Sequence, residues 1–160
     1  MDIRRVLAGG IVASLVMGMI EMVYEAVAGS GFWAPVVYIG ATVLRGLQAV
    51  QAPVAFNFWG VVLGLMGHMM NSIILGFIFV ALFARSSRAR STLVASGAAY
   101  GLAVFFVMWY LVVPAIDPVL RQLNATVFAV AHIMWGAALG LLAGAGEEPA
   151  LQVKTKTASA

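Results

Sequence analysis

The sequence contains no cysteine, and only 9% of its 160 residues are charged. The absence of thiols excludes disulfide bonds, cysteine nucleophiles, iron–sulfur clusters and thiolate zinc sites. The scarcity of charge, beside a hydrophobic share of 63%, excludes an ordinary water-exposed surface, since soluble domains are about half apolar and about a quarter charged. The composition therefore indicates an integral membrane protein.

Several catalytic signatures are also missing. The sequence has no P-loop, no GxSxG motif, no HExxH motif and no dinucleotide-binding fingerprint. Its one basic run, "RSSRAR" at Arg85–Arg90, has no interleaved aromatic residues, which argues against a nucleic-acid partner. We therefore do not expect the chain to catalyse a reaction by itself.

Four apolar segments are long enough to cross a bilayer, whose hydrocarbon core of about 30 Å needs about 20 helical residues. They cover residues 6–28, 59–84, 92–113 and 125–145. We expect an all-α fold, an integral membrane four-helix bundle over residues 1–146, with the lipid bilayer as its surroundings. The polar segment 147–160 is predicted to be a disordered cytoplasmic tail.

The basic residues predict the orientation of these helices. Two arginines, Arg45 and Arg121, lie on one side, and the other basic residues lie on the opposite side: Arg4, Arg5, Arg85, Arg88, Arg90, Lys154 and Lys156. The positive-inside rule therefore places both termini in the cytoplasm. The first segment also has features of a cleavable signal peptide, but Glu21 and Glu25 are unusual before a cleavage site, so we expect a retained helix.

Three short motifs occur in the same order in both halves of the chain. They are H-x-M-x-small-x-x-L-G (His68–Gly76 and His132–Gly140), V-L-R-x-L-amide (Val43–Gln48 and Val119–Asn124) and M-x-Y (Met22–Tyr24 and Met108–Tyr110). We interpret them as two duplicated helical hairpins, which form a parallel repeat about an axis near the membrane normal.

The first half carries an insertion between its two predicted spans. Its segment "VVYIGATVLRGLQAV" is amphipathic enough to form an extra helix at the outer interface. Trp33, Tyr38 and Trp59 are the expected anchors, because aromatic side chains collect at membrane interfaces.

Polar side chains within the spans mark the candidate site. From a helical rise of about 1.5 Å per residue, His68, His132 and Glu21 lie about 10–13 Å below the outer surface, in one layer. His68 and His132 each belong to a row of small residues spaced four apart, such as Gly64, His68 and Ser72. Small residues mark the faces where membrane helices meet, so both histidines should point into the bundle.

Three functional hypotheses fit this arrangement. In the favoured one, His68 and His132 bind a redox cofactor, with b-type haem preferred, beside Glu21 and Asn71. Arg45 and Arg121, as a repeated pair, would then hold the haem propionates or an anionic head group.

The same site would also suit a transition metal held by His68, His132 and Glu21, a two-histidine, one-carboxylate set. Four methionines lie near the histidines in sequence and could add soft ligands, although the core is their more natural place: Met66, Met69, Met70 and Met134.

The alternatives need no cofactor. Glu21 could serve proton or small-solute transport, since carboxylates inside membranes often mark such pathways. The chain could also be a structural accessory subunit, in which His68, Asn71 and His132 only bond neighbouring helices. A homodimer formed through the glycine faces, or a larger membrane complex, is the expected assembly.

The stretches "MGMIEMVYEAVAGSGFWAPVVYIGATVLRGLQ" and "GLMGHMMNSIILG" resemble small four-helix bacterial membrane proteins, loosely the YagU-like inner-membrane proteins. The resemblance implies a location in the bacterial inner membrane and assigns no chemistry to these residues.

Overall fold

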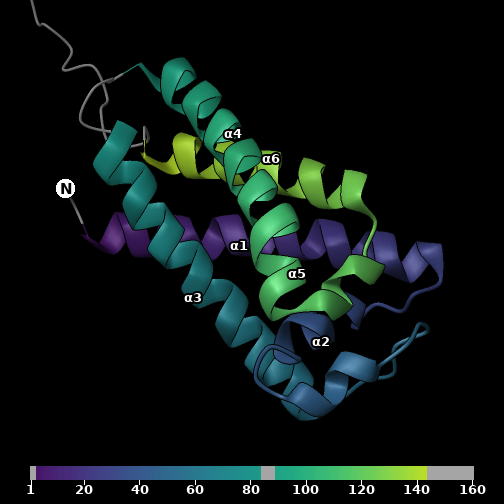
Figure 1. Ribbon diagram of the computed structural model, residues 1–160. Helices are drawn as coiled ribbons and strands as arrows, with labels where there is room; N and C mark the ends of the chain where they lie inside the picture. Colours follow the sequence, from purple (N-terminus) through teal and green to yellow (C-terminus); the bar gives the residue numbers. More distant parts are fainter. Residues whose placement is uncertain (1–2, 84–88, 144–160) are drawn as a thin grey trace, which may run out of the picture.

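The computed structural model describes residues 3–83 and 89–143, and the described part is helical with no strand. Four helices are long and apolar enough to span a membrane. They are α1 (Ile3–Ala28), α3 (Phe58–Phe83), α6 (Ala125–Ala143) and a continuous helix made of α4 (Arg90–Val107), η2 (Met108–Val112) and α5 (Val113–Ile116) (Figure 1). They occupy the four predicted segments to within a few residues. The predicted tail and most of "RSSRAR" lie outside the described residues.

Glycines set how closely α4 and α6 approach each other. A Cβ atom on Gly97 would collide with the carbonyl oxygen of Gly136, and one on Gly101 would collide with that of His132. A Cβ atom on Gly140 of α6 would likewise collide with the carbonyl oxygen of Leu93 in α4. Without side chains at these positions the two backbones touch, which is the usual way membrane helices gain packing energy.

The inserted segment differs from the single interfacial helix that we expected. It forms a short helix, α2 (Ala34–Gly40), and a separate 3-10 turn, η1 (Arg45–Ala49). α2 is almost entirely buried, because Gly40 and Gly64 let its backbone rest directly on α3. Tyr38 is therefore fully buried rather than an interfacial anchor, whereas Trp59 is 62% exposed.

The helix faces that carry glycine pack against other parts of the same chain. Gly60 faces Leu47 of η1, Gly64 faces α2, Gly10 of α1 faces Ile73 of α3, and Gly136 faces α4. These glycines therefore already pack against other parts of the same chain, and the formation of a homodimer through them stays a prediction.

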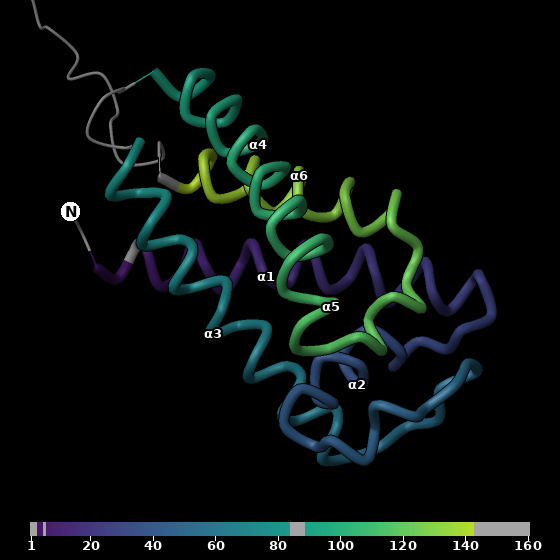
Figure 2. The backbone as a smooth tube through the Cα atoms, in the orientation of Figure 1, coloured from purple at the N-terminus to yellow at the C-terminus, as the bar shows by residue number. Residues whose placement is uncertain are grey.

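The two inter-helix segments gather at one end of the long helices, which we call the loop end (residues 29–58 and 114–124; Figure 2). Here η1 contacts a second 3-10 turn, η3 (Pro118–Gln122). Gln48 Oε1 accepts a hydrogen bond from the Val119 N–H at 3.3 Å, and Gln122 Nε2 donates to the Val50 carbonyl at 2.8 Å. These bonds connect the two halves of the chain.

Candidate functional site

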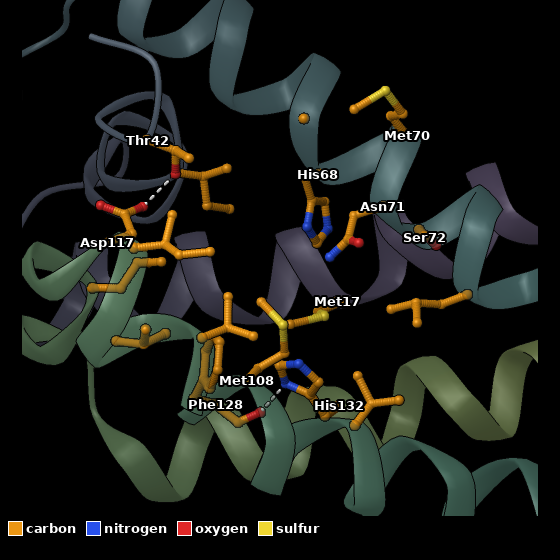
Figure 3. Close-up of a pocket in the computed structure, with 18 of the residues that line it drawn as sticks. Met17, Thr42, His68, Met70, Asn71, Ser72, Met108, Asp117, Phe128 and His132 are labelled. Carbon is orange, nitrogen blue, oxygen red and sulfur yellow. Dashed lines mark hydrogen bonds between the residues drawn. The ribbon is translucent and has the colours of Figure 1, made fainter. Parts of the chain in front are cut away.

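A cavity of about 340 Å³ lies between α3 and the α4–η2–α5 helix, which make few direct contacts with each other. Met17 of α1 and three residues of α6, including His132, form the rest of its wall within the membrane-spanning part. His68 and His132 both line this cavity, and Figure 3 shows their rings projecting into it from opposite sides. The predicted inward direction of both histidines is therefore correct.

His132 is held in one orientation by its own helix. Its Nδ1 donates a hydrogen bond to the Phe128 carbonyl at 2.8 Å, and its ring packs edge-on against the Phe128 ring at 4.4 Å between centroids. A carbonyl oxygen only accepts, so Nδ1 carries the hydrogen. In the neutral imidazole, the other ring nitrogen, Nε2, then carries no hydrogen and presents a lone pair.

His68 is held in the same way by a neighbouring helix. Its Nε2 donates to the Ser14 carbonyl of α1 at 3.0 Å, and the ring lies beside Gly18 of the same helix. The hydrogen of this neutral imidazole is therefore on Nε2, and Nδ1 is the lone pair. Among the described residues, neither lone pair has a hydrogen-bond donor.

A polar chain next to the cavity connects three helices. Trp135 Nε1 of α6 donates to Ser72 Oγ of α3 at 2.7 Å, and Ser72 Oγ donates to the Gly10 carbonyl of α1 at 2.7 Å. Asn71, the neighbour of Ser72, lines the cavity as an exposed side chain. Asn71 is thus placed where it could contact a bound ligand.

Glu21 is separate from the two histidines. It does not line the cavity, and the described residues contain no group of three His, Cys, Asp or Glu side chains that could hold a metal. The predicted set of His68, His132 and Glu21 is therefore not assembled. Glu21 is only 3% exposed, and both of its carboxylate oxygens are buried without a hydrogen-bond partner among the residues that the structure describes.

The repeated arginines do not line the cavity either. Arg45 donates to the Ile116 carbonyl at 2.6 Å, and the Arg121 guanidinium lies over the Trp109 ring at 5.1 Å. Both contacts hold the loop end together, so the expected role of this pair beside a cofactor has no support in their positions.

Sequence reasoning missed Asp117, which lies with Thr42 where the cavity meets the loop end. Thr42 Oγ1 donates to Asp117 Oδ2 at 2.7 Å, and Gln48 Nε2 donates to Oδ1. Burial raises the pKa of Asp117 above its ordinary value of 3.8, against the opposite effects of these two bonds and of Arg45. The one available signal was that Asp117 is the sole acidic residue in the second inter-helix segment.

Most of the expected methionines do not line the cavity. Met66, Met70 and Met134 are 47–62% exposed on the helix surface, and Met70 alone of these three lines the cavity. The other two lining methionines are the buried Met17 and the half-buried Met108. In the sequence these two had no feature that distinguished them from other apolar residues.

Comparison of the chain with protein-family models, with curated proteins and with solved structures gave no match. The function of the chain is therefore inferred from the geometry of the cavity.

Proposed function

We propose that this chain is a small multi-pass membrane protein that binds a redox cofactor or a metal between His68 and His132. The observation that carries the proposal is the matched state of the two imidazoles. Each donates one N–H to a backbone carbonyl and presents the other nitrogen as a lone pair. Histidines that bind metals almost always have this arrangement, because the outer hydrogen bond fixes the ring and raises its basicity.

Within this proposal, a metal ion now has better support than b-type haem. Arg45 and Arg121, the expected partners of haem propionates, bond elsewhere at the loop end. Apart from Asn71 and Ser72, the cavity wall near the histidines is apolar or thioether-bearing and has no cationic side chain, which suits a small ion more readily than a dianionic macrocycle.

The test is an absorption spectrum and a metal titration of the detergent-purified protein, each repeated with His68→Ala and His132→Ala. The proposal predicts binding of either haem or a metal ion that both substitutions weaken, with helix content by circular dichroism unchanged. A protein that binds neither, or binds equally well without the imidazoles, would refute it.

Proton or solute transport is a second candidate, and the buried carboxylate of Glu21 favours it. An ionised carboxylate without partners is costly in an apolar interior, so such groups tend to be retained for a function. Glu25, one turn away, accepts a bond from the Asn124 N–H at 3.4 Å near the loop end. Proteoliposome flux that is lost in Glu21→Gln but kept in His68→Ala would favour this candidate.

We further infer that the chain arose from two duplicated hairpins and lies in a bacterial inner membrane with both termini in the cytoplasm. The two V-L-R-x-L segments support the duplication, since each forms a 3-10 turn closed by an equivalent bond. Leu47 N–H donates to the Leu44 carbonyl at 2.8 Å, and Leu123 N–H donates to the Leu120 carbonyl at 3.1 Å. A role as an accessory subunit would follow if neither a ligand nor flux is found.

A further inference from the structure

Two methionines lie at the same part of the cavity as the two histidines. Figure 3 shows Met17 of α1 and Met108 of η2 between the His68 ring and the His132 ring. Met17 is 7% exposed, and it belongs to the turn of α1 that contacts His68 through Ser14 and Gly18. Four side chains from four different helices therefore converge on one space.

The position of Met108 depends on an irregular turn. Met108 is the first residue of η2, a π-helical turn of five residues inside an otherwise α-helical span. Pro114 follows shortly after, and it has no N–H with which to continue the regular ladder. π-turns are rare and occur frequently at functional sites. Met108 and Val112, at the two ends of this turn, both line the cavity.

The donor atoms of this group are uncharged, and the two thioether sulfurs among them are soft. Two imidazole nitrogens and two thioether sulfurs bring no negative charge, and no carboxylate joins them in the described part of the chain. Thioethers select copper(I) over harder ions. Uncharged ligands do not neutralise the charge of the ion that they bind. A divalent ion would therefore place two positive charges in this apolar surrounding, whereas a monovalent ion places one.

We propose that the cavity binds a soft monovalent cation, copper(I) or its analogue silver(I), through His68, His132, Met17 and Met108. This inference rests on the proposed function, because it names the ligand class of the same site. Coordination replaces the ligands that the ion carries in solution and involves no electron transfer.

The experiment is an anaerobic competition between the detergent-purified protein and a chromophoric copper(I) chelator, repeated with silver(I). The test variants are Met17→Leu, Met108→Leu and the double variant, because leucine keeps the volume and removes the sulfur. The matched controls are Met66→Leu and Met134→Leu, which remove exposed thioethers. Circular dichroism and gel filtration check that every variant is folded.

We expect one copper(I) ion per chain. Groups that only support the direct ligands of a metal contribute about 10- to 100-fold in affinity. The double variant loses two direct ligands, so we expect its affinity for copper(I) to fall by at least that factor. The controls should bind like the wild type, and X-ray absorption of the copper(I) form should contain a sulfur shell that the double variant lacks.

Other results separate this inference from the proposed function. If a metal or haem binds through the histidines but the methionine substitutions change nothing, the soft-ion site is wrong and the histidine site stands. If copper(I), silver(I), other metals and haem all fail to bind the folded wild type, both are wrong.

Discussion

Ser72 joins three helices through two short hydrogen bonds, from Trp135 and to the Gly10 carbonyl. In Ser72→Ala both bonds disappear and the buried Trp135 N–H has no acceptor. We expect a loss of about 1–3 kcal/mol in the free energy of unfolding, since an unsatisfied buried donor bears its full desolvation cost.

The measurement is unfolding in detergent followed by circular dichroism. The matched control is Ser91→Ala, at an exposed position of α4, which should change little. Equal stability of Ser72→Ala and the wild type would mean that this chain of bonds does not hold the helices.

Asp117 predicts a pH dependence of stability. Its pKa is raised in the folded protein by burial, so the folded state binds a proton more readily than the unfolded chain. The stability linked to this group is therefore fully present below the ordinary pKa of 3.8 and is lost as the pH rises through the raised value.

Asp117→Asn removes this titration and keeps an oxygen that accepts the bond from Thr42. We expect its melting temperature to fall less than that of the wild type between about pH 4 and pH 7. Parallel melting curves for the two proteins over this range would contradict the assignment.

At the residue scale, the histidines were predictable and their neighbours were not. His68 and His132 lie in rows of glycine and serine, which mark a packed helix face in any membrane bundle. Met17 and Met108 had no such marker, because in a helix that is apolar on all sides the sequence does not distinguish the buried face from the lipid face. Asp117 lies between α5 and η3, and its burial depends on Thr42 and Gln48 of the other inter-helix segment. The position of Met108 also depends on a π-turn that periodicity does not reveal.

At the element scale, close backbone contact holds α4 against α6. Gly136→Ala would place a Cβ atom against the Gly97 carbonyl, and neither backbone can yield without moving a helix. We expect a loss of about 1–3 kcal/mol, as for other overpacked sites.

The matched control for this change is Gly67→Ala on α3. Its Cβ would meet the Ile39 side chain at an ordinary 3.7 Å, so only the helix propensity changes, by about 1 kcal/mol in favour of alanine. The measurement is the thermal stability of both variants in detergent. If Gly136→Ala is as stable as Gly67→Ala, close backbone contact does not hold α4 against α6.

The four long helices could be predicted from hydropathy, but the packing of α2 against α3 could not. The four spans are long and apolar, so their positions depend on local composition alone. The segment that contains α2 is amphipathic enough for an interface, yet the glycines of α2 and α3 let it bury almost completely. This outcome depends on residues far apart in sequence, and no local pattern records it.

At the scale of the whole molecule, the uneven spread of basic residues predicts the orientation. Since the chain has no cysteine, single cysteines report it directly. We expect Gly46→Cys, at an exposed position of the loop end, to react with a membrane-impermeant thiol reagent in intact spheroplasts. Ser87→Cys, within the basic sequence "RSSRAR", should react only after permeabilisation. The reverse labelling pattern would overturn the orientation.

The proposed ligand lies between the imidazoles of His68 and His132. The most direct measurement is the haem and metal content per chain of the protein purified from membranes, beside that of the His68→Ala/His132→Ala double variant. We expect about one bound haem or metal ion per wild-type chain, and we expect the folded double variant to contain none. An empty wild type, or equal content in both proteins, would contradict it.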